Sequence, residues 1–308
     1  MIRSLFLTLC FLSATAAGVA QFNIVPGGKP LVLGKDTLCF SYDLRTGDTL
    51  IYTLEAMDSV DVVSGQRFAK FRSEAYKIIC DSVSPSGIMH LTMGLVFAAE
   101  RHVRGVDTTT RTTHPWIGRR QFIGIDRLGH RAYARSDNDT SATVSPGGAF
   151  QPMLLPIIDT SCGRQQQSWL SQDTVLLVEN AVPNPVLIQQ NFWRVLDHFD
   201  TLGRKTLRIQ YTQTGNGAVV LRSRGNSFQT QSLLAGYGLV TFDRALNVIL
   251  HQFATVENKF TMTVPGGIEV KGTHQTTETI TLRELRSPDP RRRWSKDPSP
   301  AKRSKTNH

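Results

Sequence analysis

Cysteine is scarce in this chain of 308 residues. Three of its four cysteines, Cys39, Cys80 and Cys162, follow the N-terminal apolar segment. Their spacing matches no zinc-binding pattern and no histidine-rich turn accompanies them, which argues against a metal centre and against a catalytic thiol. Cys39 and Cys80 lie in apolar, strand-like runs, where a buried thiol is as reasonable as a disulfide. A disulfide with undetermined pairing therefore stays open, and the odd count leaves at least one thiol unpaired.

The short motifs of the common enzyme classes are also missing. The sequence contains no Gly-x-Ser-x-Gly elbow, no His-Glu-x-x-His pair and no Walker loop. Gly215-Asn216-Gly217 and Gly236-Tyr237-Gly238 lack the third glycine of a dinucleotide site, and we interpret them as turns or bulges. Gly215-Asn216-Gly217 is the strongest local hairpin signal in the chain, because Asn and Gly both tolerate positive φ. We therefore expect no cofactor, and no residue is assigned a catalytic role.

Long amphipathic helix patterns are nearly absent as well. Only residues 64–76 and 229–236 could each hold a short helix. Apolar residues between Ile268 and Leu282 share one parity of the sequence and polar residues take the other, which is typical of a strand with one covered face. The connections are too short for parallel crossovers, so we expect antiparallel hairpins. The predicted fold class is all-β with minor helix.

The one marked apolar run lies at the N-terminus. Arg3 precedes the apolar stretch from Leu5 to Leu12, and small residues follow up to Gln21. This order is typical of a signal peptide, which we assign to residues 1–20. The run is too short to span a bilayer, and we expect no transmembrane segment in the mature chain. The predicted location is periplasmic, cell-surface or extracellular.

The positive charge is concentrated at the C-terminus. Of the net charge of +10, residues 286–308 carry +6 and Arg3 carries one, which leaves +3 for residues 21–285. This distribution does not indicate sequence-specific binding to nucleic acid. The tail is rich in proline and nearly free of apolar residues, so we expect it to be disordered. It is either a solubilising extension or a tether to anionic envelope polymers or lipid headgroups. The candidate tether residues are Arg291, Arg292, Arg293, Lys296, Lys302, Arg303 and Lys305.

Three short correspondences between the halves of the chain suggest an internal repeat. The matched pairs, in order, are Asp48-Thr49 with Asp173-Thr174, Asp81-Ser82 with Asp200-Thr201, and Asp126-Arg127 with Asp243-Arg244. Their preserved order favours two diverged copies of one β unit, although such turns also recur by chance in all-β proteins. We interpret the two Asp-Arg pairs as strand-end turns, because Asp accepts hydrogen bonds from nearby backbone N–H groups.

Together these patterns predict five segments. They are a signal peptide (1–20), a first β unit (21–140), a connecting segment (141–168), a second β unit (169–285) and the disordered basic tail (286–308). The two units form either a sandwich or curved, half-barrel-like sheets.

Two functional hypotheses from different classes follow. The first is a secreted or periplasmic protein of the cell envelope that binds or scaffolds without catalysis, and that carries an apolar or lipid-like ligand if the sheets enclose an apolar cavity. The second is a secreted hydrolase whose site is assembled from distant residues. Its candidates are His114, Asp126, His130 and His251, with a nearby Ser or Asp. Only convergence in space would support the second hypothesis.

Overall fold

The computed structural model describes nine stretches of the chain. They are residues 29–30, 41–63, 65–114, 116–137, 154–158, 168–179, 182–201, 204–223 and 226–296. The predicted signal peptide, Cys39, Cys162 and the tail residues Lys302, Arg303 and Lys305 lie outside this part of the chain.

The described residues form fourteen β-strands and one 3-10 turn. The strands of the first half are β1 (Lys29–Pro30), β2 (Thr49–Val62), β3 (Gln66–Val83), β4 (Met89–Arg104), β5 (Asp107–Arg111), β6 (Arg120–Ile125) and β7 (Arg131–Ser136). Those of the second half are β8 (Ser168–Glu179), β9 (Val182–Thr201), β10 (Arg204–Ser223), β11 (Asn226–Asp243), β12 (Val248–Val264), β13 (Ile268–Arg286) and β14 (Trp294–Ser295), with the turn η1 (Pro290–Arg292) before β14. The predicted all-β class is confirmed.

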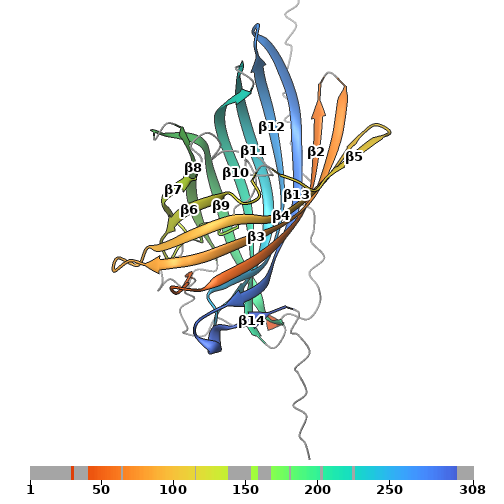
Figure 1. The fold of residues 1–308 in the computed structure, drawn as a ribbon. Coiled ribbons are helices and arrows are strands. Elements are labelled where there is room, and N and C mark those ends of the chain that lie inside the picture. The colour runs from red at the N-terminus through yellow and green to blue at the C-terminus, as the bar shows by residue number, and fades with distance from the viewer. Residues whose placement is uncertain are drawn as a thin grey trace, which may run out of the picture.

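All fourteen strands belong to one strongly twisted antiparallel sheet (Figure 1). Its main order is β1-β9-β10-β11-β12-β13-β2-β3-β4-β6-β7, with β8 beside β9, β5 beside β4 and β14 beside β13. The last long strand, β13, pairs with the first, β2, from Gly272↔Val62 to Arg286↔Thr49. Within the described chain the sheet stays open, because β7 at one end does not pair with β1 or β8, which both pair with β9 at the other end. Of the two expected arrangements, the curved sheet is therefore the one adopted, and both halves of the chain share it.

The two Asp-Arg pairs occupy similar places in the two halves, whereas Asp48 precedes β2 and Asp173 lies inside β8. Asp126 comes directly after β6, which pairs with β4, and Asp243 is the last residue of β11, which pairs with β10. The Oδ1 atom of Asp126 accepts hydrogen bonds from the Leu128 and His130 amides. That of Asp243 accepts from the Ala245 and Leu246 amides. The turn interpretation is confirmed, while the repeat itself stays a prediction.

One apolar core lies against the inner face of the sheet and draws on both halves. It includes Tyr52, Ile78, Trp193, Phe242 and Ile280, each less than 2% exposed. Leu154 and Leu155, from the predicted connecting segment, are buried in the same cluster. The Tyr42 hydroxyl donates to the Pro156 carbonyl at 2.9 Å, which holds this segment against the first half. Because one core serves both halves, the sheet is a single packed unit.

Three local predictions are wrong. Residues 64–76 and 229–236, considered for helix, lie largely in β3 and β11. Gly215-Asn216-Gly217 does not turn, because it lies inside β10 and pairs with β9 on one side and β11 on the other. Ladder bonds on both sides outweigh the local turn preference of Asn-Gly. Gly236 and Gly238 lie in the paired middle of β11, and a Cβ at 238 would come within 2.4 Å of the Tyr211 ring. These glycines allow close approach of neighbouring groups.

The C-terminal boundary also differs from the prediction. The ordered chain continues past Leu285 through η1 and β14 to Lys296. Arg292 is buried, and its Nη2 donates to the Asp43 carbonyl at 2.6 Å and the Leu246 carbonyl at 3.2 Å. It also reaches Asp48 Oδ2 at 3.3 Å. Carbonyl and carboxylate acceptors offset the burial of this guanidinium, so Arg292 fastens the chain end and is not available as a tether.

Cys80 is a free, buried thiol on β3. Its Sγ donates to the Ser82 carbonyl at 3.7 Å. Burial, with smaller effects of Asp48 and Asp81, raises the pKa of Cys80 to about 11. This side chain is therefore the buried small residue that its apolar surroundings indicated.

Candidate functional site

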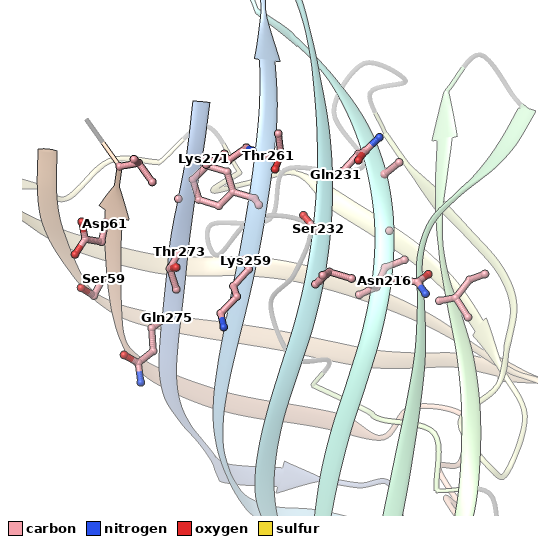
Figure 2. Close-up of a pocket in the computed structure, with 18 of the residues that line it drawn as sticks. Ser59, Asp61, Asn216, Gln231, Ser232, Lys259, Thr261, Lys271, Thr273 and Gln275 are labelled. Atoms are coloured by element: carbon pink, nitrogen blue, oxygen red, sulfur yellow. The ribbon is translucent and has the colours of Figure 1, made fainter. Parts of the chain in front are cut away.

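An open groove of about 1000 Å³ crosses seven neighbouring strands, from β9 through β10, β11, β12, β13 and β2 to β3 (Figure 2). Most of its lining side chains alternate along the strands with buried ones. For example, Ser59 follows buried Asp58, and Lys259 follows buried Asn258. The groove therefore lies on the outer face of the sheet, opposite the core.

The lining combines apolar and polar groups. Leu233 is 65% exposed, Ile188 45% and Val63 81%, which leaves aliphatic surface open to solvent. Hydroxyl and amide side chains share the lining with them. These are Ser59, Asn216, Gln231, Ser232, Thr261, Thr273 and Gln275. The sequence predicted an apolar cavity for a carrier, and the structure offers an amphipathic groove on the outer face.

The ionised groups of the groove are mainly cationic. Arg67, Lys259 and Lys271 contribute positive charge, and Asp61 contributes the carboxylate. The cations pair only loosely with acidic neighbours, Lys259 with Glu257 at 3.4 Å and Lys271 with Glu269 at 3.9 Å. Exposed pairs of this kind are worth about 0–1 kcal/mol, so an anionic ligand group can displace them at little cost.

A second polar feature lies on the inner face, where β2, β3, β4 and β13 are neighbours. We call Asp58, Arg72, Glu74, Glu100 and Glu278 the buried charge cluster, and each is at most 8% exposed. Arg72 Nε donates to Asp58 Oδ2 and its Nη1 to Glu74 Oε1, both at 2.7 Å. Glu74 Oε2 accepts from the Tyr76 hydroxyl at 2.6 Å. The cluster is held by side chains on adjacent strands and not by a loop.

Burial and charge act oppositely on Asp58. Burial alone would raise its pKa, but hydrogen bonds from His274 and Arg72 and the charge of Lys70 hold it well below its usual value. The Thr276 hydroxyl also donates to Asp58 Oδ1 at 2.8 Å. Asp58 is therefore ionised at neutral pH, as the partner of Arg72.

Glu278 differs from the other acids of the cluster. It is 1% exposed, and neither carboxyl oxygen has a hydrogen-bond partner. Burial raises its pKa well above the usual value, and Glu74 and Asp58 add to this while Arg72 opposes it. Its neighbours across the ladder are Ala254 on β12 and Ala56 on β2, whose small side chains offer no polar contact. Burial in this position therefore favours the protonated form of the Glu278 carboxyl group.

The structure does not bring the hydrolase candidates together. Asp126 Oδ2 lies 2.9 Å from His130 Nδ1 beside the start of β4, whereas His114 Nε2 lies 3.9 Å from Glu100 near its end. Glu100 lies eleven positions after Met89, a distance of roughly 36 Å along the strand at about 3.3 Å per residue. His251 lies on β12, where burial and the charge of Lys296 lower its pKa. Asp126 and His130 form a pair that also shapes a turn.

The remaining candidate residues do not form a common site. Arg291, Arg293 and Lys296 are exposed near the chain end, so a tethering role for them stays a prediction. Within the described residues, no group of three or more His, Cys, Asp or Glu side chains is placed to hold a metal ion. None of the helical turns in that part of the chain is long and apolar enough to cross a membrane.

Sequence reasoning missed both the groove and the buried charge cluster. A signal for the cluster existed, since Arg72 and Glu74 share the parity of Tyr76 and Ile78, and Glu278 that of Ile280. Charged residues on a buried parity indicate an internal ion network. The groove left no comparable signal, because its residues come from seven strands and from both halves of the chain.

No known protein-family model matches the sequence, and no curated protein matches it. Among solved structures, lipovitellin covers 80% of this chain at 9% identity and a TM-score of 0.47, and this chain spans 26% of lipovitellin. A Parabacteroides distasonis protein, provisionally described as a lipoprotein, covers 81% at 8% identity and a TM-score of 0.28, over 100% of its own chain. Pseudomonas aeruginosa OpdQ covers 78% at 6% identity and a TM-score of 0.23, also over its full chain. At these values the similarities assign neither a family nor a function.

Proposed function

We propose that this chain is an exported, non-catalytic binding protein of the cell envelope, and that the outer groove holds a lipid-like amphiphile with an anionic headgroup. The observation that carries the proposal is the composition of the groove. Exposed aliphatic side chains such as Leu233 and Ile188 lie in the same hollow as Arg67, Lys259 and Lys271. An acyl chain would cover the first set and an anionic headgroup would meet the second.

The sequence supports export independently of the groove. Its first twenty residues have the order of a signal peptide, which would deliver the protein to the envelope where such amphiphiles occur. The hydrolase hypothesis gains no support, because its candidate residues lie at separate places on the sheet.

Native mass spectrometry of the mature protein, purified from its own envelope fraction, tests the proposal. We expect a lipid-sized adduct that organic extraction removes. Leu233→Asp should abolish the adduct by placing a charge against the acyl chain. Leu170→Asp is the matched control, because Leu170 is 61% exposed on β8 but does not line the groove.

A bare mass for the unextracted protein would exclude tight lipid binding. Equal loss of the adduct in both variants would place the ligand outside the groove. Circular dichroism of both variants shows whether the fold survives the substitution.

A further inference from the structure

Three rings lie on the outer face of β4, β6 and β7, apart from the groove. We call His90, Phe122 and Tyr133 the aromatic platform. Tyr133 and His90 stack with ring centroids 5.8 Å apart and an interplanar angle of 27°. The Tyr133 hydroxyl also lies 2.8 Å from His90 Nδ1, so the two rings are fixed to each other across the sheet.

Gly124 on β6 makes this arrangement possible. A Cβ at this position would lie 2.4 Å from Tyr133 Cε1 and 2.7 Å from its Cδ1. Tyr133 pairs with Gly124 in the β6–β7 ladder, and Gly124 pairs with His90 in the β4–β6 ladder. The ring of Tyr133 therefore lies down across β6 toward His90 because the strand has no side chain beneath it.

Two arginines flank the third ring. The Cζ atoms of Arg120 and Arg135 lie 5.6 Å and 5.2 Å from the centroid of Phe122. Arg120 also pairs with Asp137, with Nε 3.2 Å from Oδ2, in a solvent-exposed contact of little net strength. Both arginines are exposed, so their guanidinium groups meet solvent beside the rings. Stacking on Phe122 holds them in orientation without neutralising them.

This combination fits one kind of ligand. Ring faces suit the C–H face of a sugar, and an ordered guanidinium plane binds a carboxylate through two parallel hydrogen bonds. The platform spans three adjacent strands, about 10 Å at roughly 4.8 Å per strand, so it offers an extended surface. A surface that binds a membrane would present exposed aliphatic side chains. The apolar side chains of the platform are aromatic instead, with Tyr133 36% exposed and Phe122 half-buried.

We propose that the aromatic platform, with Arg120 and Arg135, is a binding site for an acidic polysaccharide. A sugar ring stacks on Tyr133, and its carboxylate pairs with Arg135 and Arg120. The site is independent of the lipid groove and of the basic tail. It would attach the protein to a uronic-acid polymer of the envelope or its surroundings.

Isothermal titration of the full mature protein with polygalacturonate tests this site, with uncharged dextran as the reference polymer. We expect Arg135→Gln to weaken polygalacturonate binding about tenfold, the usual effect of losing a charge-assisted pair. Arg101→Gln is the matched control, since Arg101 stacks on Phe71 at 4.4 Å elsewhere on the sheet, and it should leave the affinity unchanged. Tyr133→Leu should weaken binding, whereas Tyr133→Phe, which keeps the ring, should not.

Three outcomes would overturn the proposal. One is equal binding of dextran. Another is equal loss with Arg101→Gln and Arg135→Gln, which would show a general charge effect. The third is loss of binding when Lys302, Arg303 and Lys305 are replaced by Ser while Arg135→Gln has no effect, which would assign the polymer to the tail. This titration contains no lipid, so a negative result would not bear on the proposed lipid binding in the groove.

Discussion

The inner face of the sheet carries an ion network over β2, β3, β4 and β13 and neutral amides with aromatic rings over β9 and β10. Over β2 and β3, Arg72 is held between Asp58 and Glu74. Over β9 and β10, the Gln213 amide donates to Gln189 Oε1 at 2.8 Å. Nearby, the Trp193 ring packs on Tyr211 with centroids 4.7 Å apart and donates its Nε1 proton to Ser171 at 2.8 Å.

The two regions bury polar groups at different cost. Removing an ion from water costs several kcal/mol, which is offset only by a complete set of partners, while a neutral amide needs only its hydrogen bonds. The stability of the region that carries the ion network is therefore more sensitive to the loss of one charged side chain. Similar strands can therefore bury polar groups on their inner face in two ways, and mutations should distinguish the two.

Arg72→Met should have the largest effect. It leaves Asp58 and Glu74 buried without their shared cation, a loss of about 3–5 kcal/mol in the free energy of unfolding. Urea denaturation measures this value. The triple variant Asp58→Asn, Arg72→Met, Glu74→Gln, which removes all three charges, should recover most of it. A loss below about 1 kcal/mol for Arg72→Met would mean that water reaches the cluster and that the two regions do not differ.

Gln213→Leu should have an intermediate effect. The substitution leaves Gln189 Oε1 buried without its donor, which costs about 1–3 kcal/mol. The double variant Gln189→Leu, Gln213→Leu removes both partners and should be close to the wild type in urea denaturation. If the double variant is as unstable as Arg72→Met, the amide region is as demanding as the charged one.

Of these substitutions, Glu278→Gln should change the free energy of unfolding least at acidic pH. The folded-state pKa of Glu278 is raised above its ordinary value of 4.5, so its protonated form stabilises the fold fully below that pH. This contribution falls as pH rises above 4.5 toward the folded-state value, because the unfolded chain loses the proton first. Gln stays neutral, so the variant should gain stability relative to the wild type as pH rises. Urea midpoints across this pH range measure the difference, and a constant difference would show that Glu278 is ionised in the fold.

Asp58 should give the opposite pH dependence of stability to Glu278. Its folded-state pKa is lowered, so its contribution is present above the usual value of 3.8 and is lost as pH falls. The wild type should therefore lose stability on the acid side through Asp58 and on the alkaline side through Glu278. Asp58→Asn should weaken mainly the acid-side dependence, with a smaller effect through Glu278, whose pKa Asp58 helps to raise.

Local sequence patterns predicted the strands well, because the alternation of side chains is local. The turn role of Asp126 and Asp243 was also predictable, since each carboxylate bonds the backbone two to four residues away. The Asn216 prediction failed because β9 and β11 pair with this segment on both sides, and neither partner is visible in a short window.

Long-range contacts explain the remaining differences. The chain end looked disordered by composition, but Arg292 finds acceptors on Asp43, Asp48 and Leu246, far away in sequence. The alternation in β13 predicted one covered face along its length, yet Ile268 is 64% exposed and burial begins only near Thr276. The groove and the aromatic platform depend on which strands become neighbours, which the sequence does not reveal.

The pairing of β13 with β2 has a consequence for the order in which the protein folds. During synthesis β2 emerges long before its partner strand β13, which is completed only at Arg286. Until then one edge of β2 has no partner from the same chain, and exposed edges recruit other chains. Contacts across such a sequence separation also slow folding. A protein built this way gains from a holding chaperone until its last long strand is made.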